Sequence, residues 1–236
     1  MKRLLAAMVV AAAAIPMFAG VAGLPAPGDA GSPAHTGVAA RYVEHGVRET
    51  GAQNLVTGVL LNYRAYDTFG EVMVIFAALA AVSAVLSRGP AQPGSGAARQ
   101  QVEISPVVAF VIRLTAPFIA IFGVMIILKG HLAPGGGFQG GVILGALLVL
   151  LSVVLGRGLE RPLVPEPAAR WLQAAGPLAF AVVGLFGLAC AGTLLSYPAG
   201  PGADMLRAAM MLVLELGIGI GSAAIILWLF LQMRGE

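Results

Sequence analysis

The chain has 236 residues, of which 58% are hydrophobic and only 11% are charged, with a formal net charge of +3. Soluble domains carry about 25% charged residues, so a chain this poor in charge cannot cover a soluble surface and is expected to lie in a membrane. The basic residues are scattered and form no run that would bind nucleic acid, so no nucleic-acid partner is predicted.

The apolar residues gather in six segments, each close to the length of about 20 residues that crosses a bilayer. The runs are continuous and long instead of alternating, which indicates helices and not barrel strands. The predicted fold is therefore an all-α integral membrane protein with about six transmembrane helices. The segments cover residues 4–23, 69–86, 107–128, 138–155, 174–195 and 208–231.

The first segment has two interpretations. A basic start at Lys2 and Arg3, an apolar stretch and small residues near its end are also typical of a secretory signal peptide. The apolar run is longer than the usual signal core, which favours a retained span. Cleavage would leave five spans and the same orientation for the rest.

The basic residues predict the orientation of the chain, because cytoplasmic loops carry an excess of Lys and Arg. With the N-terminus inside, the inner side holds eight basic residues and the outer side holds five. This bias predicts a multi-pass protein of the cell membrane with both termini in the cytoplasm.

A segment rich in Gly, Pro and Ser, residues 91–105, reads as a flexible linker. It predicts a module of two spans with an external loop in residues 1–90, and a module of four spans in residues 106–236. Within the external loop, residues 41–49 could form a short surface helix. Residues 55–61 are apolar but too short to span, so they are expected at the interface or against other protein.

Two carboxylates, Asp67 and Glu71, stand four residues apart at the mouth of the second span and share a helix face. Asp67 can cap the helix by accepting bonds from the free N–H groups of the first turn. Capping explains Glu71 less well, because Glu71 is followed by a long stretch without charged residues and so lies within the span. Carboxylates in this setting usually face protein or water and often relay ions, so both are candidates for an ion pathway.

Glu215 is a third pathway candidate, since it lies inside the last apolar segment. Arg207 is eight residues away, which is about 12 Å along a helix and too far for a direct pair. Glu215 therefore needs a partner on another helix or chain, or it stays protonated as a buried residue that only bonds neighbouring helices.

The sequence KGHLAPGGGFQGG at residues 129–141 predicts a tight turn between the third and fourth spans. It lacks the Gly-Lys-Ser/Thr ending of a phosphate-binding loop. Lys129 and His131 could anchor the helix end at the membrane interface or belong to a proton path. The residues expected to shape this turn and the start of the next helix are Pro134, Gly135, Gly136, Gly137, Phe138, Gly140 and Gly141.

Catalytic signatures do not appear in the sequence. It contains no nucleophile with a nearby base, no zinc-protease motif and no dinucleotide fingerprint, and Cys190 is its single cysteine. We therefore predict no enzymatic activity, no cofactor and no metal site.

The turn sequence of residues 129–141, together with Arg-Leu-Thr-Ala-Pro at residues 113–117, resembles the B-subunit family of Mrp/Mnh-type multisubunit Na⁺/H⁺ antiporters. The stretch from residue 214 to 219, Leu-Glu-Leu-Gly-Ile-Gly, is also similar to the last helix of that family. This resemblance covers residues 107–231.

A different resemblance covers residues 54–71, NLVTGVLLNYRAYDTFGE. They look like the segment that ends the large A-type subunit of these antiporters. In related membrane-bound hydrogenases, the same segment is a separate small subunit. The resemblance implies a role in ion transport for the glutamate of this segment, here Glu71.

Together the resemblances imply a helper subunit in a complex that moves Na⁺ and H⁺. Its expected partners are membrane lipid, large antiporter-like subunits and other small membrane subunits. Two alternatives remain: the ion-pumping module of a membrane-bound hydrogenase or related oxidoreductase, and a purely structural scaffold.

Overall fold

The computed structural model describes residues 2–86, 104–155 and 166–233, and in these ranges the regular structure is helical. The all-α fold predicted from the sequence is therefore confirmed. The chain divides into two compact units, Met1–Glu44 and His45–Glu236. The expected linker, residues 91–105, falls outside the described residues apart from its last two, so its flexibility stays a prediction.

The first unit contains α1 (Lys2–Ala22) and the short α2 (Pro33–Thr36). The length and hydropathy of α1 are enough to cross a membrane, and none of its side chains is buried within the chain. The apolar surface of α1 therefore needs cover from lipid or from another protein, as expected for an isolated span or a signal segment.

An amphipathic helix, α3 (Val38–Thr50), contains the short surface helix expected from the sequence. It is followed by α4 (Leu55–Gly58) and by one turn of π-helix, η1 (Val59–Tyr63). These two elements correspond to the apolar segment that was predicted to be too short to span. Turns of π-helix are rare and are often found at functional sites.

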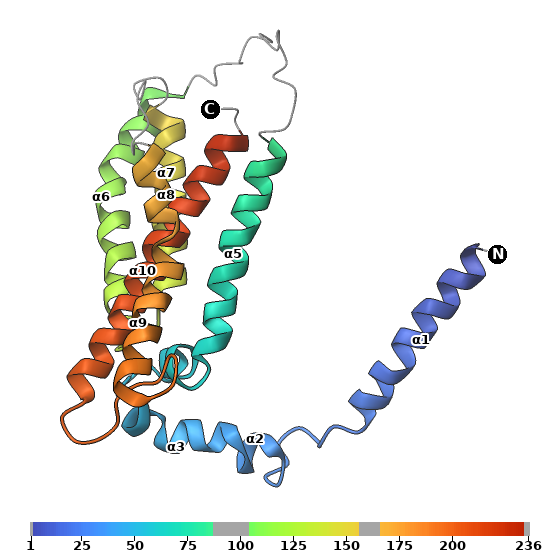
Figure 1. The fold of residues 1–236 in the computed structure, drawn as a ribbon. Helices are drawn as coiled ribbons and strands as arrows, with labels where there is room; N and C mark the ends of the chain where they lie inside the picture. The colour runs from blue at the N-terminus through green and yellow to red at the C-terminus, as the bar shows by residue number, and fades with distance from the viewer. Residues whose placement is uncertain (1, 87–103, 156–165, 234–236) are drawn as a thin grey trace. The chain divides into compact units, whose positions relative to one another are not determined.

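The second unit is a bundle around α10 (Asp204–Met233), which runs obliquely through it (Figure 1). α10 packs against α5 (Ala65–Leu86), α6 (Pro106–Leu128) and α7 (Gly137–Leu155). It also packs against α8 (Glu166–Gln173) and α9 (Ala175–Ala191). Apolar side chains along α10, with Met211 and Leu214 fully buried, make it the centre of the core.

Glycines bring α7 and α10 close together. A Cβ added to Gly141 would lie 2.8 Å from the carbonyl oxygen of Gly219, and one added to Gly145 would lie 3.2 Å from the Cα of Ala223. Small residues spaced four apart are typical of close helix crossings in membranes, where contact between backbones replaces the hydrophobic effect.

The fifth apolar segment differs from its expected bounds of 174–195. α9 ends at Ala191 because Gly192 takes the left-handed conformation that terminates helices, with φ of 79°. At its other end α9 is preceded by α8, which extends the helical path back to Glu166. Within the described residues, five helices are long and apolar enough to span, and α9 is a shorter apolar helix beside them. Each of the six expected apolar segments thus corresponds to a helix.

The bundle surface is apolar, as a lipid-facing surface must be. In α6, Phe110, Leu114 and Phe118 follow one another at intervals of four residues, and each is exposed. Such a stripe on a helix of this hydropathy would not be stable in water, and it identifies the chain as a multi-pass membrane protein.

Candidate functional site

The carboxylate of Glu215 lies in the middle of α10, and the residue is only 3% exposed. Its Oε2 accepts a hydrogen bond from the backbone N–H of Gly137 at the start of α7. Its Oε1 lies 3.5 Å from the hydroxyl of Thr57 in α4. The sequence predicted that Glu215, unless it stays protonated, needs a partner on another helix or chain. In the structure the neighbouring groups come from Gly137 of α7 and Thr57 of α4.

The turn between α6 and α7, residues 129–136, is shaped around this carboxylate. Gly135 and Gly136 have φ of 152° and 143°, a region that favours glycine. A Cβ on Gly130 would lie 2.5 Å from Oε1 of Glu215, and one on Gly136 would lie 3.1 Å from Oε2. The glycines therefore let the backbone close around the carboxylate, which no larger residue would permit.

Asn54 holds the turn in place. Its side-chain amide donates to the carbonyl oxygens of Gly130 at 2.7 Å and of Ala133 at 3.0 Å, and its backbone N–H donates to the carbonyl oxygen of His131 at 3.1 Å. Thr57 adds a bond of 2.8 Å to the Gly130 carbonyl. We call the group formed by Glu215, Asn54, Thr57 and residues 130–137 the glutamate cage.

Sequence reasoning did not select Asn54 or Thr57. Their residue types are ordinary at the start of a helix, and Asn54 does accept a capping bond from the N–H of Val56 at 3.1 Å. Only the fold brings them to a turn more than seventy residues away in the chain.

Further polar groups are buried near the cage. Nδ1 of His131 and the hydroxyl of Tyr197 have no hydrogen-bond partner among the described residues. Tyr197 lies in the loop between α9 and α10, where burial raises the pKa of its phenol and the Glu215 carboxylate raises it further. Two polar atoms without a partner among the described residues therefore lie buried close to the cage, next to the apolar core.

The remaining turn residues pack the helices. Phe138 lies against the apolar core, and Pro134 is exposed in the turn. A Cβ on Gly140 would lie 2.7 Å from the carbonyl oxygen of Gly123 in α6. Gly140 is thus where α7 touches the backbone of α6.

We expect Gly140→Ala to lower the stability of the purified chain in detergent by about 1–3 kcal/mol, because the added methyl forces α6 and α7 apart. Gly70→Ala is the matched control, since nothing lies within 4 Å of the added Cβ in α5. Alanine there should be neutral or stabilising by up to about 1 kcal/mol. Equal thermal unfolding midpoints for the two variants would contradict the close crossing.

The other predicted pathway residues lie outside the cage. Asp67 is exposed and pairs with Arg64, whose Nη2 lies 2.5 Å from its carboxylate. Glu71 is exposed on α5, and Lys129 is exposed at the end of α6. The fold therefore unites Glu215 with the turn that carries His131, and leaves Asp67, Glu71 and Lys129 on the surface.

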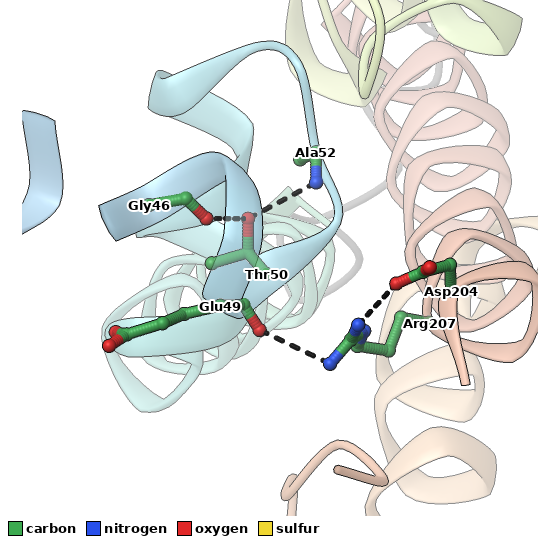
Figure 2. Close-up of polar contacts among 6 residues, drawn as sticks. All are labelled: Gly46, Glu49, Thr50, Ala52, Asp204 and Arg207. Atoms are coloured by element: carbon green, nitrogen blue, oxygen red, sulfur yellow. Dashed lines mark hydrogen bonds and ion pairs between the residues drawn. The ribbon is translucent and has the colours of Figure 1, made fainter. Parts of the chain in front are cut away.

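One end of α10 is fixed by Arg207, which the sequence analysis considered only for its distance from Glu215. Figure 2 shows its guanidinium between the carboxylate of Asp204 and the backbone carbonyl of Glu49, 3.5 Å away. The hydroxyl of Thr50 donates to Gly46 and accepts from the N–H of Ala52, which fixes the turn after α3 (Figure 2).

An open pocket of about 590 Å³ lies beside this arginine. It is formed by the end of α3 with the residues that follow it, and by the loop before α10 with the first turn of α10. Its lining residues are Val47, Arg48, Gly51, Gln53, Gly200, Pro201, Asp204 and Arg207.

The fold and the cage define a class: a multi-pass membrane protein built around an intramembrane carboxylate. Residues 107–228, more than half of the chain, match the family model described as a domain related to the MnhB subunit of Na⁺/H⁺ antiporters, and the chain belongs to this family. Residues 6–102 match a second model, described as the E subunit of MBH. The two resemblances seen in the sequence are thereby confirmed.

Two curated relatives match part of the chain. An uncharacterized protein of Methanocaldococcus jannaschii is 27% identical over 153 residues, which are 59% of this chain and 58% of that protein. The probable K(+)/H(+) antiporter A/B subunit of Rhizobium meliloti is 27% identical over 157 residues, which are 58% of this chain and 16% of that protein. The chain spans less than two thirds of the length of each.

Two solved structures share the fold. A chain of the membrane-bound sulfane sulfur reductase, an archaeal respiratory membrane complex, superposes with a TM-score of 0.72 and 28% identity, covering 98% of this chain and 97% of that one. A chain of the Mrp complex from Dietzia sp. DQ12-45-1b superposes with a TM-score of 0.59 and 25% identity, covering 96% of this chain and 26% of that one.

Proposed function

We propose that this chain is a non-enzymatic membrane subunit of a multisubunit cation/proton antiporter complex, in which it helps to form the path for Na⁺ and H⁺. The observation that carries the proposal is the glutamate cage, which holds a carboxylate within a spanning helix. Its location in the region that matches the antiporter family supports the assignment.

The cage suits a group that exchanges protons or cations. A charge at the centre of a span costs about 2.5–3.5 kcal/mol on insertion scales, so such residues are usually retained for function. The carboxylate of Glu215 is bonded by the backbone N–H of Gly137, and its Oε1 lies 3.5 Å from the neutral hydroxyl of Thr57; no basic side chain bonds it among the residues that the structure describes. A carboxylate without a fixed counter-ion can accept a proton or a cation in turn.

The surface charges support a role within a complex. Glu71 is exposed six residues into α5, a helix that is otherwise apolar toward its far end. A carboxylate at this depth needs a partner other than lipid. Large antiporter-like subunits and small membrane subunits supply that partner in our proposal, with Asp67, Glu71, Lys129 and His131 as further pathway residues.

The proposed location is the cell membrane, with both termini in the cytoplasm. This orientation follows from the excess of basic residues on the inner side. It places the glutamate cage toward the outer half of the bilayer.

A second candidate function is the ion-pumping membrane module of a redox complex. It is favoured by one observation: the chain matches almost the full length of a sulfane sulfur reductase chain, whereas it covers a quarter of the Mrp chain. In that case ion movement would require electron transfer in another subunit.

Affinity purification of the tagged chain from its native membrane, followed by identification of its partners, tests the proposal. Antiporter subunits alone would support it, and subunits with iron–sulfur motifs would favour the redox candidate. Recovery of the chain without membrane partners would contradict both.

We further expect the isolated chain in proteoliposomes to move neither Na⁺ nor H⁺, because no hydrogen bond joins Glu71 to the glutamate cage among the described residues. A sodium-dependent pH change in these vesicles, measured with an internal pH dye, would instead indicate a self-sufficient transporter. Vesicles with the full complex are the positive control.

A further inference from the structure

The helical path of α8 and α9 is broken where they meet. α8 ends at Gln173 and α9 begins at Ala175. Pro177 has no N–H, so it cannot donate to the carbonyl of Gln173, four residues earlier. The flanking bond, from the N–H of Leu178 to the carbonyl of Ala174, is present at 2.9 Å. The carbonyl of Gln173 therefore lacks the N–H that would bond it in a continuous helix.

A small cavity of about 10 Å³ lies beside this break. α5 contributes Val72 and Ile75 to its wall, α7 contributes Phe138, and α10 contributes Ile218, Ser222 and Ile225. Ile75 stands midway along α5 (Ala65–Leu86), so the cavity is at mid-depth in the bundle. A cavity of about 10–15 Å³ has room for one water molecule.

Polar groups meet at the cavity. The side-chain amide nitrogen of Gln173 is buried and has no hydrogen-bond partner among the described residues, and the residue is only 7% exposed. Ser222, also buried, lines the same space. A Cβ on Gly221 would lie 3.5 Å from the Gln173 carbonyl oxygen, so this carbonyl faces α10. The amide nitrogen of Gln173, the hydroxyl of Ser222 and a carbonyl that lacks its helical partner offer the two to four polar contacts that a buried water needs.

The cavity continues the polar face of the glutamate cage. Ser222 follows Glu215 by seven residues, which is two helical turns and about 10 Å along the same face of α10. Farther along α10, Gln232 accepts a bond of 2.9 Å from Ser83 of α5. Polar groups thus recur along the seam between α5 and α10, from the cage toward the opposite end of the bundle.

We propose that the cavity holds a water molecule bound to Gln173 and Ser222, and that this water is a mid-membrane station for protons that pass between Glu215 and the far end of α10. The water takes up one proton from the cage side as it releases one to the far side, so it is unchanged after each passage. Because Glu215 is about 10 Å away along α10, further water molecules in the assembled complex carry the proton between the two. The relay role rests on the proposed function, whereas the presence of the water does not.

Radiolytic hydroxyl-radical labelling of the purified full chain tests for the water, because radicals formed from a bound water oxidise the side chains next to it. We expect Ile218 and Ile225, which line the cavity, to be oxidised several-fold more than Leu214 and Leu227 of the same helix, which do not. Gln173→Leu should remove this difference. Equal oxidation of all four residues in the unmodified chain would overturn the bound water.

Transport by the assembled complex tests the relay. We expect Gln173→Leu to slow proton movement several-fold at unchanged subunit stoichiometry, while Gln53→Leu, at an exposed glutamine, leaves it unchanged. Preferential labelling together with wild-type transport in Gln173→Leu would mean a structural water only and would overturn the relay. If the wild-type complex moves no ions at all, the proposed function fails and the relay fails with it, while the labelling result still decides the water.

Discussion

Replacing Glu71 with alanine is expected to lower ion exchange by the assembled complex to about a tenth of the wild-type rate or less, because it removes a carboxylate from a spanning helix where such groups often relay ions. Glu71 is exposed and packs against nothing that the fold needs, so the complex should still assemble. Antiport would be measured in membrane vesicles at matched subunit levels.

Glu44→Ala provides the matched control. Glu44 is also an exposed carboxylate, but it lies on α3 and not on a spanning helix. Its loss should leave both assembly and transport unchanged. Wild-type rates in Glu71→Ala would remove this carboxylate from the pathway, and loss of assembly would reduce it to an interface residue.

Replacing Glu215 with glutamine should also abolish most transport, while the chain keeps its stability. The amide oxygen can still accept the N–H of Gly137, and the amide nitrogen can donate to Thr57, so the cage stays closed. Glutamine cannot take up or release a proton, nor attract a cation as a carboxylate does. The measurement is antiport in vesicles, alongside thermal unfolding of the purified chain.

Glu215→Ala separates chemistry from structure. It leaves the buried N–H of Gly137 without an acceptor, which should cost about 1–3 kcal/mol of stability in addition to any loss of transport. If Glu215→Gln transports at the wild-type rate and only Glu215→Ala is impaired, then Glu215 serves only to bond neighbouring helices.

The helices could be predicted from the sequence because membrane insertion demands long apolar runs, and each expected segment is helical. The glycine-rich turn was also predictable, since Pro134 and the glycines after it leave few backbone choices. What could not be predicted was that this turn closes around Glu215, because contacts between distant segments leave no periodic signal.

The neutral polar residues of the buried sites could not be selected from the sequence either. Charged residues in an apolar run attract notice, whereas Asn54, Thr57 and Gln173 have ordinary roles at helix ends. Their importance comes from burial, and burial depends on which helices pack together. The fifth span illustrates the same limit, since nothing in the sequence placed Ser222 beside Pro177.

The glutamate cage also dictates an order of events during synthesis. Asn54 and Thr57 are made first, the turn with Gly130 and Gly137 follows, and Glu215 emerges last, on the final helix. Until α10 enters the bilayer, the N–H of Gly137 lacks the carboxylate that accepts its hydrogen bond. The hydroxyl of Thr57 then bonds only the carbonyl of Gly130. A chain whose translation stops before α10 therefore contains no carboxylate at this position, and its cage lacks the acceptor for the N–H of Gly137.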